Sequence, residues 1–312
     1  MADRHESSGG DPGKEKQEPI LNTEIGAGKP KRESGILRIV GAESEEEIEM
    51  LKEFKRRFDD QEKEVGEILG GLRPQEREKT EEEKRIVEFI LGKMPEFVER
   101  YGGIPVNLKP EHVHFLEVDE RSKERLKAAK KFGFYDAPRQ FIGILPRANS
   151  LMSARTVLHE VLHFNEFQSF TKGKSGKLAQ RRQGFAMQLG KTREEYFSLI
   201  GDAIVEKLAA KFEEEYFDFI PELKKMRENN SRREANEEGE VAYEEAVGVL
   251  DDIVIKQVYN KNKNRFKSEE EVFNSFARSA MTGRLLEVAR LIEKSFGKGV
   301  FKILGDTSKK TF

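Results

Sequence analysis

The sequence contains no cysteine and no tryptophan. Without cysteine, the chain can form neither a disulfide framework nor a thiolate metal site, and it has no thiol nucleophile. The absence of cysteine also suits a reducing compartment. With 22 residues, phenylalanine is the main aromatic residue available to fill the core. Any metal site must therefore be built from histidine and carboxylate side chains.

Long apolar runs are also missing. No uninterrupted apolar stretch approaches the roughly 18 residues that a membrane-spanning helix needs, so we expect no membrane association. The first 35 residues contain no apolar run typical of a signal peptide. The 56 basic and 58 acidic residues nearly balance, which gives no reason to expect a nucleic-acid partner. We therefore expect a cytoplasmic protein.

Composition divides the chain into a tail and one domain. Residues 1–35 combine glycine, proline and charged residues with little apolar surface, which predicts a disordered N-terminal tail. Residues 36–312 are expected to form a single domain. Hydrophobic residues make up 36% of the chain and charged residues 37%, so we expect a highly charged surface around a modest core.

Two helices are predicted from their first residues. Ser44 and Glu47 have the spacing of a capping box and predict a charged peripheral helix over residues 44–69. Thr80 and Glu83 repeat that spacing. The helix that they start has a regular apolar face, so we expect it to be packed against the core.

Strand signals are confined to the first half of the chain. Residues 36–40, the alternating residues 112–118 and the apolar residues 140–146 read as strands, whereas residues 133–136 read as a turn. A basic helix is expected over residues 121–131. Everything after residue 151 reads as helical. A few early strands followed only by helices predict a predominantly helical α+β fold with a small sheet.

One predicted helix carries the most informative motif. The segment Thr156–Phe164 contains His159-Glu160-Val161-Leu162-His163, an H-E-x-x-H sequence in a chain with only five histidines. Residues four apart lie on one helix face, so both imidazoles can reach one metal ion. Glu160 points about 100° away, where it can hold a metal-bound water. The structural alternative is two histidines on a partly buried helix beside a solvated glutamate.

A protein-bound zinc usually has three protein ligands and one water. Because no histidine follows His163, the third ligand is either acidic or one of the upstream residues His112 and His114. We expect those two histidines on the surface of a strand instead. The helix predicted from about residue 197 to 212 supplies the acidic candidates.

Asp202 and Glu206 are the acids of that helix that lie away from its lysine-bearing face. A lone carboxylate on an apolar face costs several kcal/mol unless it is paired or bound to a cation. Asp202 therefore most needs a cation, and Glu206, one turn on, can hydrogen-bond a ligand histidine. The alternative is that both acids pair with arginines such as Arg155, Arg181 or Arg182.

These two helices resemble the active site of the gluzincin branch of the zincin metallopeptidases, to which the thermolysin-like enzymes belong. The second helix of that family typically reads Asn-Glu-Ala/Gly-x-x-Asp/Glu, and the matching stretch here is Gly201-Asp202-Ala203-Ile204-Val205-Glu206. The resemblance implies Zn²⁺ bound by His159, His163 and Asp202, with Glu206 supporting a ligand.

The match departs from the family pattern in three ways. Gly201 replaces asparagine, Asp202 replaces a glutamate ligand, and about 39 residues separate His163 from Asp202, where roughly 20 are usual. These differences leave Glu206 open as the ligand. The small residues Gly201 and Ala203 would permit the closer approach that the shorter aspartate requires.

The resemblance implies a minimal zincin-like fold and a zinc metallopeptidase that hydrolyses a peptide or protein substrate. Glu160 would be the general base for a metal-activated water, and Tyr216 or Tyr243 the donor that stabilises the oxyanion. We expect the catalytic core to span residues 80–217, with a helical C-terminal part over residues 218–312.

The sequence also suggests where the substrate cleft lies and leaves an alternative function open. The strand at 140–146 is expected to be the sheet edge that borders the substrate cleft. The alternative function is a catalytically silent binding or regulatory module on the same scaffold, for which Gly201, Asp202 and the charged helix at 44–69 are the motivation. The sequence predicts neither the substrate nor the oligomeric state.

Overall fold

The computed structural model describes residues 38–40, 75–119, 132–136, 141–145, 147–172, 178–188, 194–230, 241–307 and 310–311. All of them belong to one structural unit, Lys31–Phe312. The tail expected over residues 1–35 and the helices expected over 44–69 and 121–131 lie outside the described residues.

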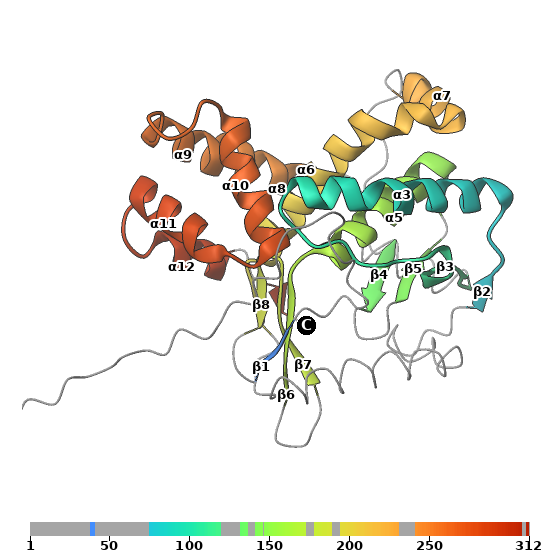
Figure 1. Ribbon diagram of the computed structural model, residues 1–312, viewed down its shortest axis with the longest axis horizontal. Helices are drawn as coiled ribbons and strands as arrows, with labels where there is room; N and C mark the ends of the chain where they lie inside the picture. The colour runs from blue at the N-terminus through green and yellow to red at the C-terminus, as the bar shows by residue number, and fades with distance from the viewer. Residues whose placement is uncertain are drawn as a thin grey trace, which may run out of the picture. The chain divides into compact units, whose positions relative to one another are not determined.

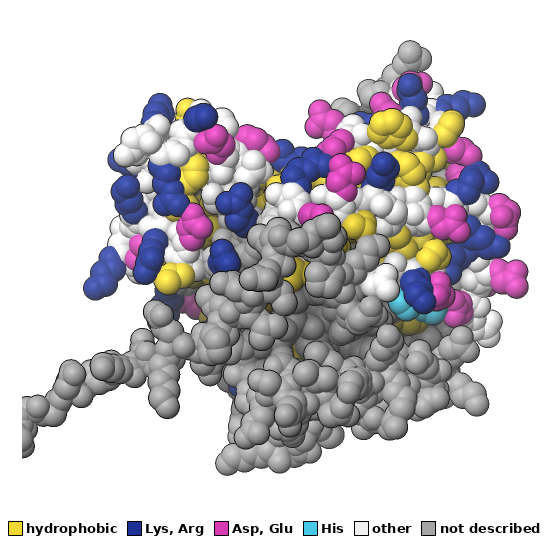
Figure 2. All heavy atoms as spheres, in the orientation of Figure 1, with side chains coloured by type: hydrophobic (Ala, Val, Ile, Leu, Met, Phe, Trp, Pro, Cys, Tyr) yellow, Lys and Arg dark blue, Asp and Glu magenta, His cyan; other side chains and the backbone are white. Residues whose placement is uncertain are grey.

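The described part of the chain is α+β and mostly helical, as the sequence predicts (Figure 1). None of its helices combines the length and hydropathy needed to cross a lipid bilayer. The face seen in Figure 2 shows lysine and arginine side chains interspersed with aspartate and glutamate over the described helices. The helices are α3 (Glu81–Arg100), α5 (Ser150–Asn165), α6 (Ser198–Tyr216), α7 (Pro221–Asn230), α8 (Val241–Gly248), α9 (Lys256–Lys261), α10 (Glu269–Thr282), α11 (Leu285–Phe296) and α12 (Val300–Thr307), with the short 3-10 helices η1 (Pro110–His112) and η2 (Phe217–Phe219) and the π-helix η3 (Val249–Ile255).

The first sheet has four described strands in the order β2-β3-β5-β4, namely β2 (Gln75–Arg77), β3 (Val113–Glu117), β5 (Phe141–Ile144) and β4 (Gly133–Asp136). The strands predicted near residues 112–118 and 140–146 are confirmed as β3 and β5. The turn predicted at residues 133–136 is wrong, because that segment pairs with β5 as the antiparallel strand β4.

The prediction that the strand at 140–146 forms the edge of the sheet is also wrong. β5 lies inside the sheet, parallel to β3 on one side and antiparallel to β4 on the other. All four residues of β5 are buried, which is typical of an interior strand. Among the described strands, β4 therefore stands at the end of the sheet beside the motif helix.

The second sheet has the order β1-β6-β7-β8-β9-β10. It corrects the prediction that only helices follow residue 151, because four of its strands occupy the interval between α5 and α6. The strand predicted near residues 36–40 is confirmed as β1, which pairs in parallel with β6. The bounds are β1 (Arg38–Val40), β6 (Gln168–Lys172), β7 (Leu178–Gln183), β8 (Ala186–Gln188), β9 (Glu194–Tyr196) and β10 (Lys310–Thr311).

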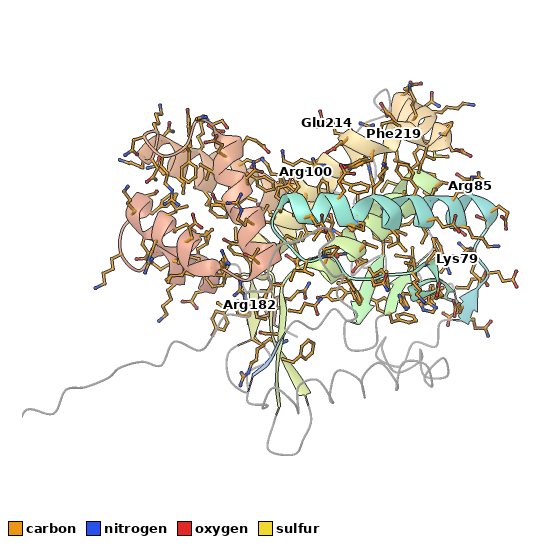
Figure 3. The ribbon with its side chains drawn as sticks, viewed as in Figure 1. Lys79, Arg85, Arg100, Arg182, Glu214 and Phe219 are labelled. Atoms are coloured by element: carbon orange, nitrogen blue, oxygen red, sulfur yellow. The ribbon has the colours of Figure 1, made fainter. Side chains whose placement is uncertain are left out.

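Helix α3 starts at the predicted capping box. The Thr80 side chain accepts from the backbone N–H of Glu83, and the Glu83 carboxylate accepts from the backbone N–H of Thr80. At the other end, Arg100 donates to both carboxylate oxygens of Glu215, at 2.6 and 2.8 Å, and so ties α3 to the end of α6 (Figure 3). Between these ends, Phe97 packs edge-to-face on Phe212, with ring centroids 5.2 Å apart.

The motif helix α5 lies at the centre of the core and contacts α3, α6, β4 and β5. It starts where the Asn149 side chain accepts from the backbone N–H of Met152. Its apolar residues Leu158, Val161 and Leu162 are fully buried. Packing on several sides therefore fixes the helix that carries the H-E-x-x-H residues.

Candidate metal centre

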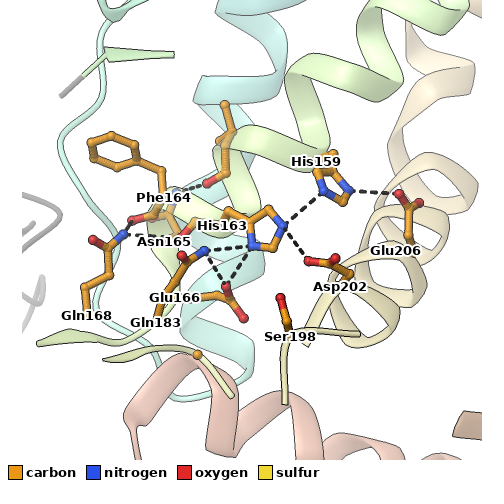
Figure 4. A network of polar contacts seen from close by, with 12 residues as sticks. His159, His163, Phe164, Asn165, Glu166, Gln168, Gln183, Ser198, Asp202 and Glu206 are labelled. Atoms are coloured by element: carbon orange, nitrogen blue, oxygen red, sulfur yellow. Dashed lines mark hydrogen bonds and ion pairs between the residues drawn. The ribbon is translucent and has the colours of Figure 1, made fainter. Parts of the chain in front are cut away.

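The Nε2 atoms of the two motif histidines face one another. Nε2 of His159 lies 3.0 Å from Nε2 of His163 (Figure 4), and their ring planes are inclined by 78°. Two imidazole nitrogens bound to one tetrahedral zinc, each at about 2.05 Å, stand about 3.3 Å apart. The pair is therefore close to the geometry in which both nitrogens share one ion.

The other nitrogen of each ring faces a carboxylate. Nδ1 of His159 lies 2.9 Å from Oε1 of Glu206, and Nδ1 of His163 lies 2.9 Å from Oε2 of Glu166. Carboxylates in this position hold an imidazole in one orientation and raise its basicity as a ligand. Helix α6 supplies one of them and the end of α5 the other.

The two acids of α6 lie on different sides of the histidine pair. Oδ1 of Asp202 is 3.6 Å from Nε2 of His163, on the side where the two Nε2 atoms meet (Figure 4). Glu206 contacts Nδ1 of His159 instead. Asp202 is therefore the α6 acid that stands beside the converging nitrogens.

These side chains do not form a complete set of metal ligands in the described part of the chain, where no three His, Asp or Glu side chains meet as such a set. An imidazole nitrogen and a carboxylate oxygen on one tetrahedral zinc stand about 3.4 Å apart, close to the 3.6 Å between His163 and Asp202. The arrangement is thus two converging nitrogens with one carboxylate beside them.

Glu160 is buried against the first sheet. Its side chain packs on Gly133 of β4, where an added Cβ would lie only 2.7 Å from Oε1 of Glu160. Burial raises the pKa of Glu160, and the charges of His159 and His163 counter this only in part. A carboxyl group with a raised pKa is suited to accept and return a proton near neutral pH.

Burial lowers the pKa of His159, but the hydrogen bond and charge of Glu206, together with Glu160 and Asp202, outweigh it and raise the pKa to about 9. The 2.9 Å contact between Nδ1 of His159 and Oε1 of Glu206 is an ion pair. Across the 3.0 Å contact between the two Nε2 atoms, one imidazole donates and the other accepts, and the raised pKa of His159 favours it as the donor.

Helix α6 is held at its start by the C-terminal part of the chain. Phe197, the residue before the helix, has φ 63° in the left-handed region, a conformation that costs a non-glycine residue about 1–3 kcal/mol. Its ring packs on Phe301, with centroids 4.6 Å apart, and a Cβ at Gly305 would lie 2.5 Å from that ring. Packing on α12 therefore helps to set where α6, and with it Asp202, begins.

The sequence predicts that Gly201, through its small size, permits a close approach of α6 to the metal, but the structure gives it a different neighbour. It is buried, and an added Cβ would meet the backbone of Ala186 at 3.7 Å and Phe185 at 3.8 Å, which are ordinary contacts. Gly201 therefore faces the turn between β7 and β8, and the approach of α6 to α5 does not depend on its small size. Ala203 is fully buried on the same helix.

Tyr216 is not brought to the candidate centre, which corrects its assignment as an oxyanion donor. It lies 14 residues beyond Asp202 on the same helix, about 21 Å along the axis. Its hydroxyl accepts from Arg100 at 2.9 Å instead. Tyr243 lies in α8, and its side chain is outside the described residues.

The upstream histidines also contact other groups. Nδ1 of His112 accepts from the backbone N–H of Lys109 at 3.1 Å. His114 lies 2.7 Å from Glu76 and stacks on Phe141. Neither is placed as a third ligand.

Two of the arginines considered as partners for the α6 acids, Arg155 and Arg182, donate to other groups. Arg155 donates to Glu213 at 2.8 and 2.9 Å. Arg182 donates to the backbone oxygens of Gly184 and Gly283 at 2.8 and 2.6 Å. Asp202 contacts His163, and Glu206 contacts His159.

Three residues of the site escape the sequence analysis. Glu166 contacts His163, Gln183 of β7 lies 2.9 Å from Nδ1 of His163, and the Tyr135 ring of β4 stacks on the His163 ring with centroids 5.7 Å apart. Only Glu166 has a local signal, because it lies one turn after His163. The other two come from strands whose positions depend on pairing between distant segments.

Comparison of the chain with models of known protein families, with curated proteins and with solved structures finds no match. The function is therefore inferred from the geometry of the described residues.

Proposed function

We propose that this chain is a zinc-dependent metallopeptidase of the gluzincin type, in which His159, His163 and Asp202 hold Zn²⁺ and Glu160 is the general base. The observation that carries the proposal is the convergence of the two Nε2 atoms, 3.0 Å apart, with a carboxylate on each Nδ1. Imidazole and carboxylate are borderline donors that suit zinc.

Bound Zn²⁺ would supply a Lewis acid that lowers the pKa of a water toward about 7 and polarises a peptide carbonyl. Glu160 takes the proton of the attacking water and returns it to the leaving amine. Its raised pKa and its fixed place against Gly133 suit both transfers. Glu206 and Glu166 keep the two Nε2 atoms available as ligands.

Strand β4 is the natural place for the substrate backbone. It stands at the end of the described sheet beside α5, the position at which an extended peptide would add as a further strand. The same strand carries Gly133, which touches Glu160, and Tyr135, which stacks on His163. A peptide bound along β4 would pass next to the proposed base.

Metal content and one substitution test the proposal. Protein purified without added zinc is expected to contain, or to take up on titration, close to one zinc per chain. A value below about 0.2 with no uptake contradicts the proposal. A broad peptide library should be cleaved by the wild type and spared by Glu160→Gln, which keeps the size of the side chain but removes the base.

The second candidate is a catalytically silent zincin-like module. It is favoured by the incomplete ligand set among the described residues and by the aspartate at position 202. The buried Glu160 beside the histidines argues against it, since a purely structural metal site needs no base. Cleavage that disappears in Glu160→Gln excludes this candidate.

A further inference from the structure

Glu166 is a buried acid that the proposed reaction does not use. It follows α5 directly and is only 1% exposed. A carboxylate removed from water in this way costs several kcal/mol unless partners compensate it. Its Oε2 atom lies 2.9 Å from Nδ1 of His163, so its main described partner is the second motif histidine.

Gln183, on strand β7, contacts both Glu166 and His163. Its Nε2 atom, on β7, lies 3.2 Å from Oε2 of Glu166 and 2.9 Å from Nδ1 of His163. Oε2 of Glu166 can only accept, so its 2.9 Å contact assigns the proton to Nδ1. The Gln183 amide then donates to Oε2 of Glu166, and its approach to Nδ1 is a close contact between two donors, not a hydrogen bond. The proton on Nδ1 leaves Nε2 with a free lone pair.

Gly184, in the turn after β7, lies against the carboxylate of Glu166. Gly184 has φ +49°, and an added Cβ there would lie 2.0 Å from Oε1 of Glu166. Its N–H donates to the backbone oxygen of Phe167 at 2.8 Å, and its own oxygen accepts from Arg182 at 2.8 Å. A larger residue at position 184 would displace the Glu166 carboxylate, and the positive φ also favours glycine, so this turn limits where the carboxylate can lie.

We propose that Glu166 and Gln183 are positioning residues that fix His163 with its proton on Nδ1 and its Nε2 atom directed at the metal. This inference rests on the proposed function. It also explains the long interval between His163 and Asp202, because that interval contains the strands that bring Gln183 onto His163 and Gly184 onto Glu166. His159 is oriented from α6, whereas His163 is oriented from the end of α5 and from β7.

The test compares zinc affinity, measured by competition with a chromophoric chelator, across matched variants. Glu166→Ala should bind zinc about 10- to 100-fold more weakly than the wild type. Glu166→Gln keeps an acceptor oxygen of the same shape and should recover part of that loss. Gln183→Ala should weaken binding less than Glu166→Ala does, because it leaves the carboxylate in place.

Glu213→Gln is the matched control. Glu213 is another largely buried glutamate, but it pairs with Arg155 and Arg227 and not with a motif histidine. It should lower stability and leave zinc affinity unchanged. If Glu166→Gln and Gln183→Ala both bind zinc as tightly as the wild type, the positioning role is overturned.

A second readout needs no metal. The ¹⁵N shifts of the His163 ring in metal-free wild-type protein report which nitrogen carries the proton, and Nδ1 is expected. A proton on Nε2 contradicts the inference even if Glu166→Ala fails to fold. A wild type that binds no zinc but has the proton on Nδ1 refutes the proposed function and leaves the geometry of His163 standing.

Discussion

Gly133 of β4 lies directly against Glu160 of α5. An added Cβ at Gly133 would stand 2.7 Å from Oε1 and 2.8 Å from Cγ of that side chain, and 2.7 Å from Cγ2 of Thr156. These distances are shorter than real Cβ contacts, so a larger residue must push the strand or the glutamate away. The absence of a side chain at this position therefore sets how deeply the proposed base sits.

Gly133→Ala should reduce peptide hydrolysis by at least about tenfold, because a small displacement of a catalytic group is costly. Zinc affinity should stay within about threefold of the wild type, since no metal ligand moves. Both are measured on the same preparation, by peptide cleavage and by chelator competition.

Gly92→Ala is the control for that substitution. Gly92 lies in α3, and an added Cβ there meets nothing within 4 Å, so the change should be neutral or stabilise the helix by up to about 1 kcal/mol. Full activity in Gly133→Ala would show that Glu160 does not depend on the contact with β4.

Zinc should stabilise the folded protein. A ligand that binds only the folded state at about 100 times its dissociation constant adds about 2.7 kcal/mol. Thermal unfolding with and without zinc should therefore show a higher midpoint in zinc, and a chelator should reverse it. His159→Ala should remove most of the shift, because it deletes one of the two converging nitrogens. An equal shift in that variant would place the metal elsewhere.

The sequence predicts the helices that carry the site because their signals are local. The capping pair Thr80 and Glu83 and the spacing of His159 and His163 act within one or two helical turns, where propensity and side-chain periodicity decide the structure. The α+β class follows from the same signals.

The strands between α5 and α6 and strand β4 are missed for a common reason. β6 pairs with β1, a segment about 130 residues earlier, and β4 is a strand because its backbone pairs with β5. Such pairings are set by tertiary contacts and leave a weak local pattern in short polar segments. Segments of this kind read equally well as turns or helices.

The residues of the candidate site also fall into two groups, those predicted from local sequence and those placed by strand pairing. His159, Glu160, His163, Asp202 and Glu206 are chosen from the sequence by helical periodicity, and the structure brings them together. The contacts of Gln183, Gly133 and Tyr135 require the strand pairings and therefore appear only in three dimensions. The periodicity of α6 marks its solvent face, but it does not distinguish which acid faces Nε2.

The capping box of α3 yields a stability prediction. Thr80→Ala removes one of two reciprocal contacts, of 3.2 and 2.9 Å, at the start of the helix. The expected cost is about 1 kcal/mol, measured by chemical denaturation, with zinc affinity unchanged because the cap is remote from α5. Glu81→Gln removes an exposed ion pair with Lys84 on the same turn and should lower the midpoint much less than Thr80→Ala does. Equal midpoints for the wild type and Thr80→Ala would show that the cap does not contribute.

Asp202, the first of the two acids on α6, is expected to hold the metal. Asp202→Ala should weaken zinc binding much more than Glu206→Ala. Oδ1 of Asp202 is 3.6 Å from Nε2 of His163, beside the converging nitrogens, whereas Glu206 lies 2.9 Å from Nδ1 of His159. Removing Asp202 takes a charged ligand from a three-ligand site, while removing Glu206 loosens the orientation of one ligand, at a typical cost of about 10- to 100-fold.

Competition titration with a chromophoric chelator on both variants decides between them, and Asp202→Asn and Glu206→Gln separate the loss of charge from the loss of bulk. Asp202→Asn should still bind poorly, because a neutral amide is a weak ligand for zinc. Glu206→Gln should retain most of the affinity, because its amide oxygen can still accept from Nδ1 of His159. If Glu206→Ala is the more damaging of the two alanine variants, the ligand lies one helical turn further along α6. His159 would then have to turn its ring so that Nδ1 faces the metal, and the ¹⁵N shifts of that ring in the zinc-bound protein would report it.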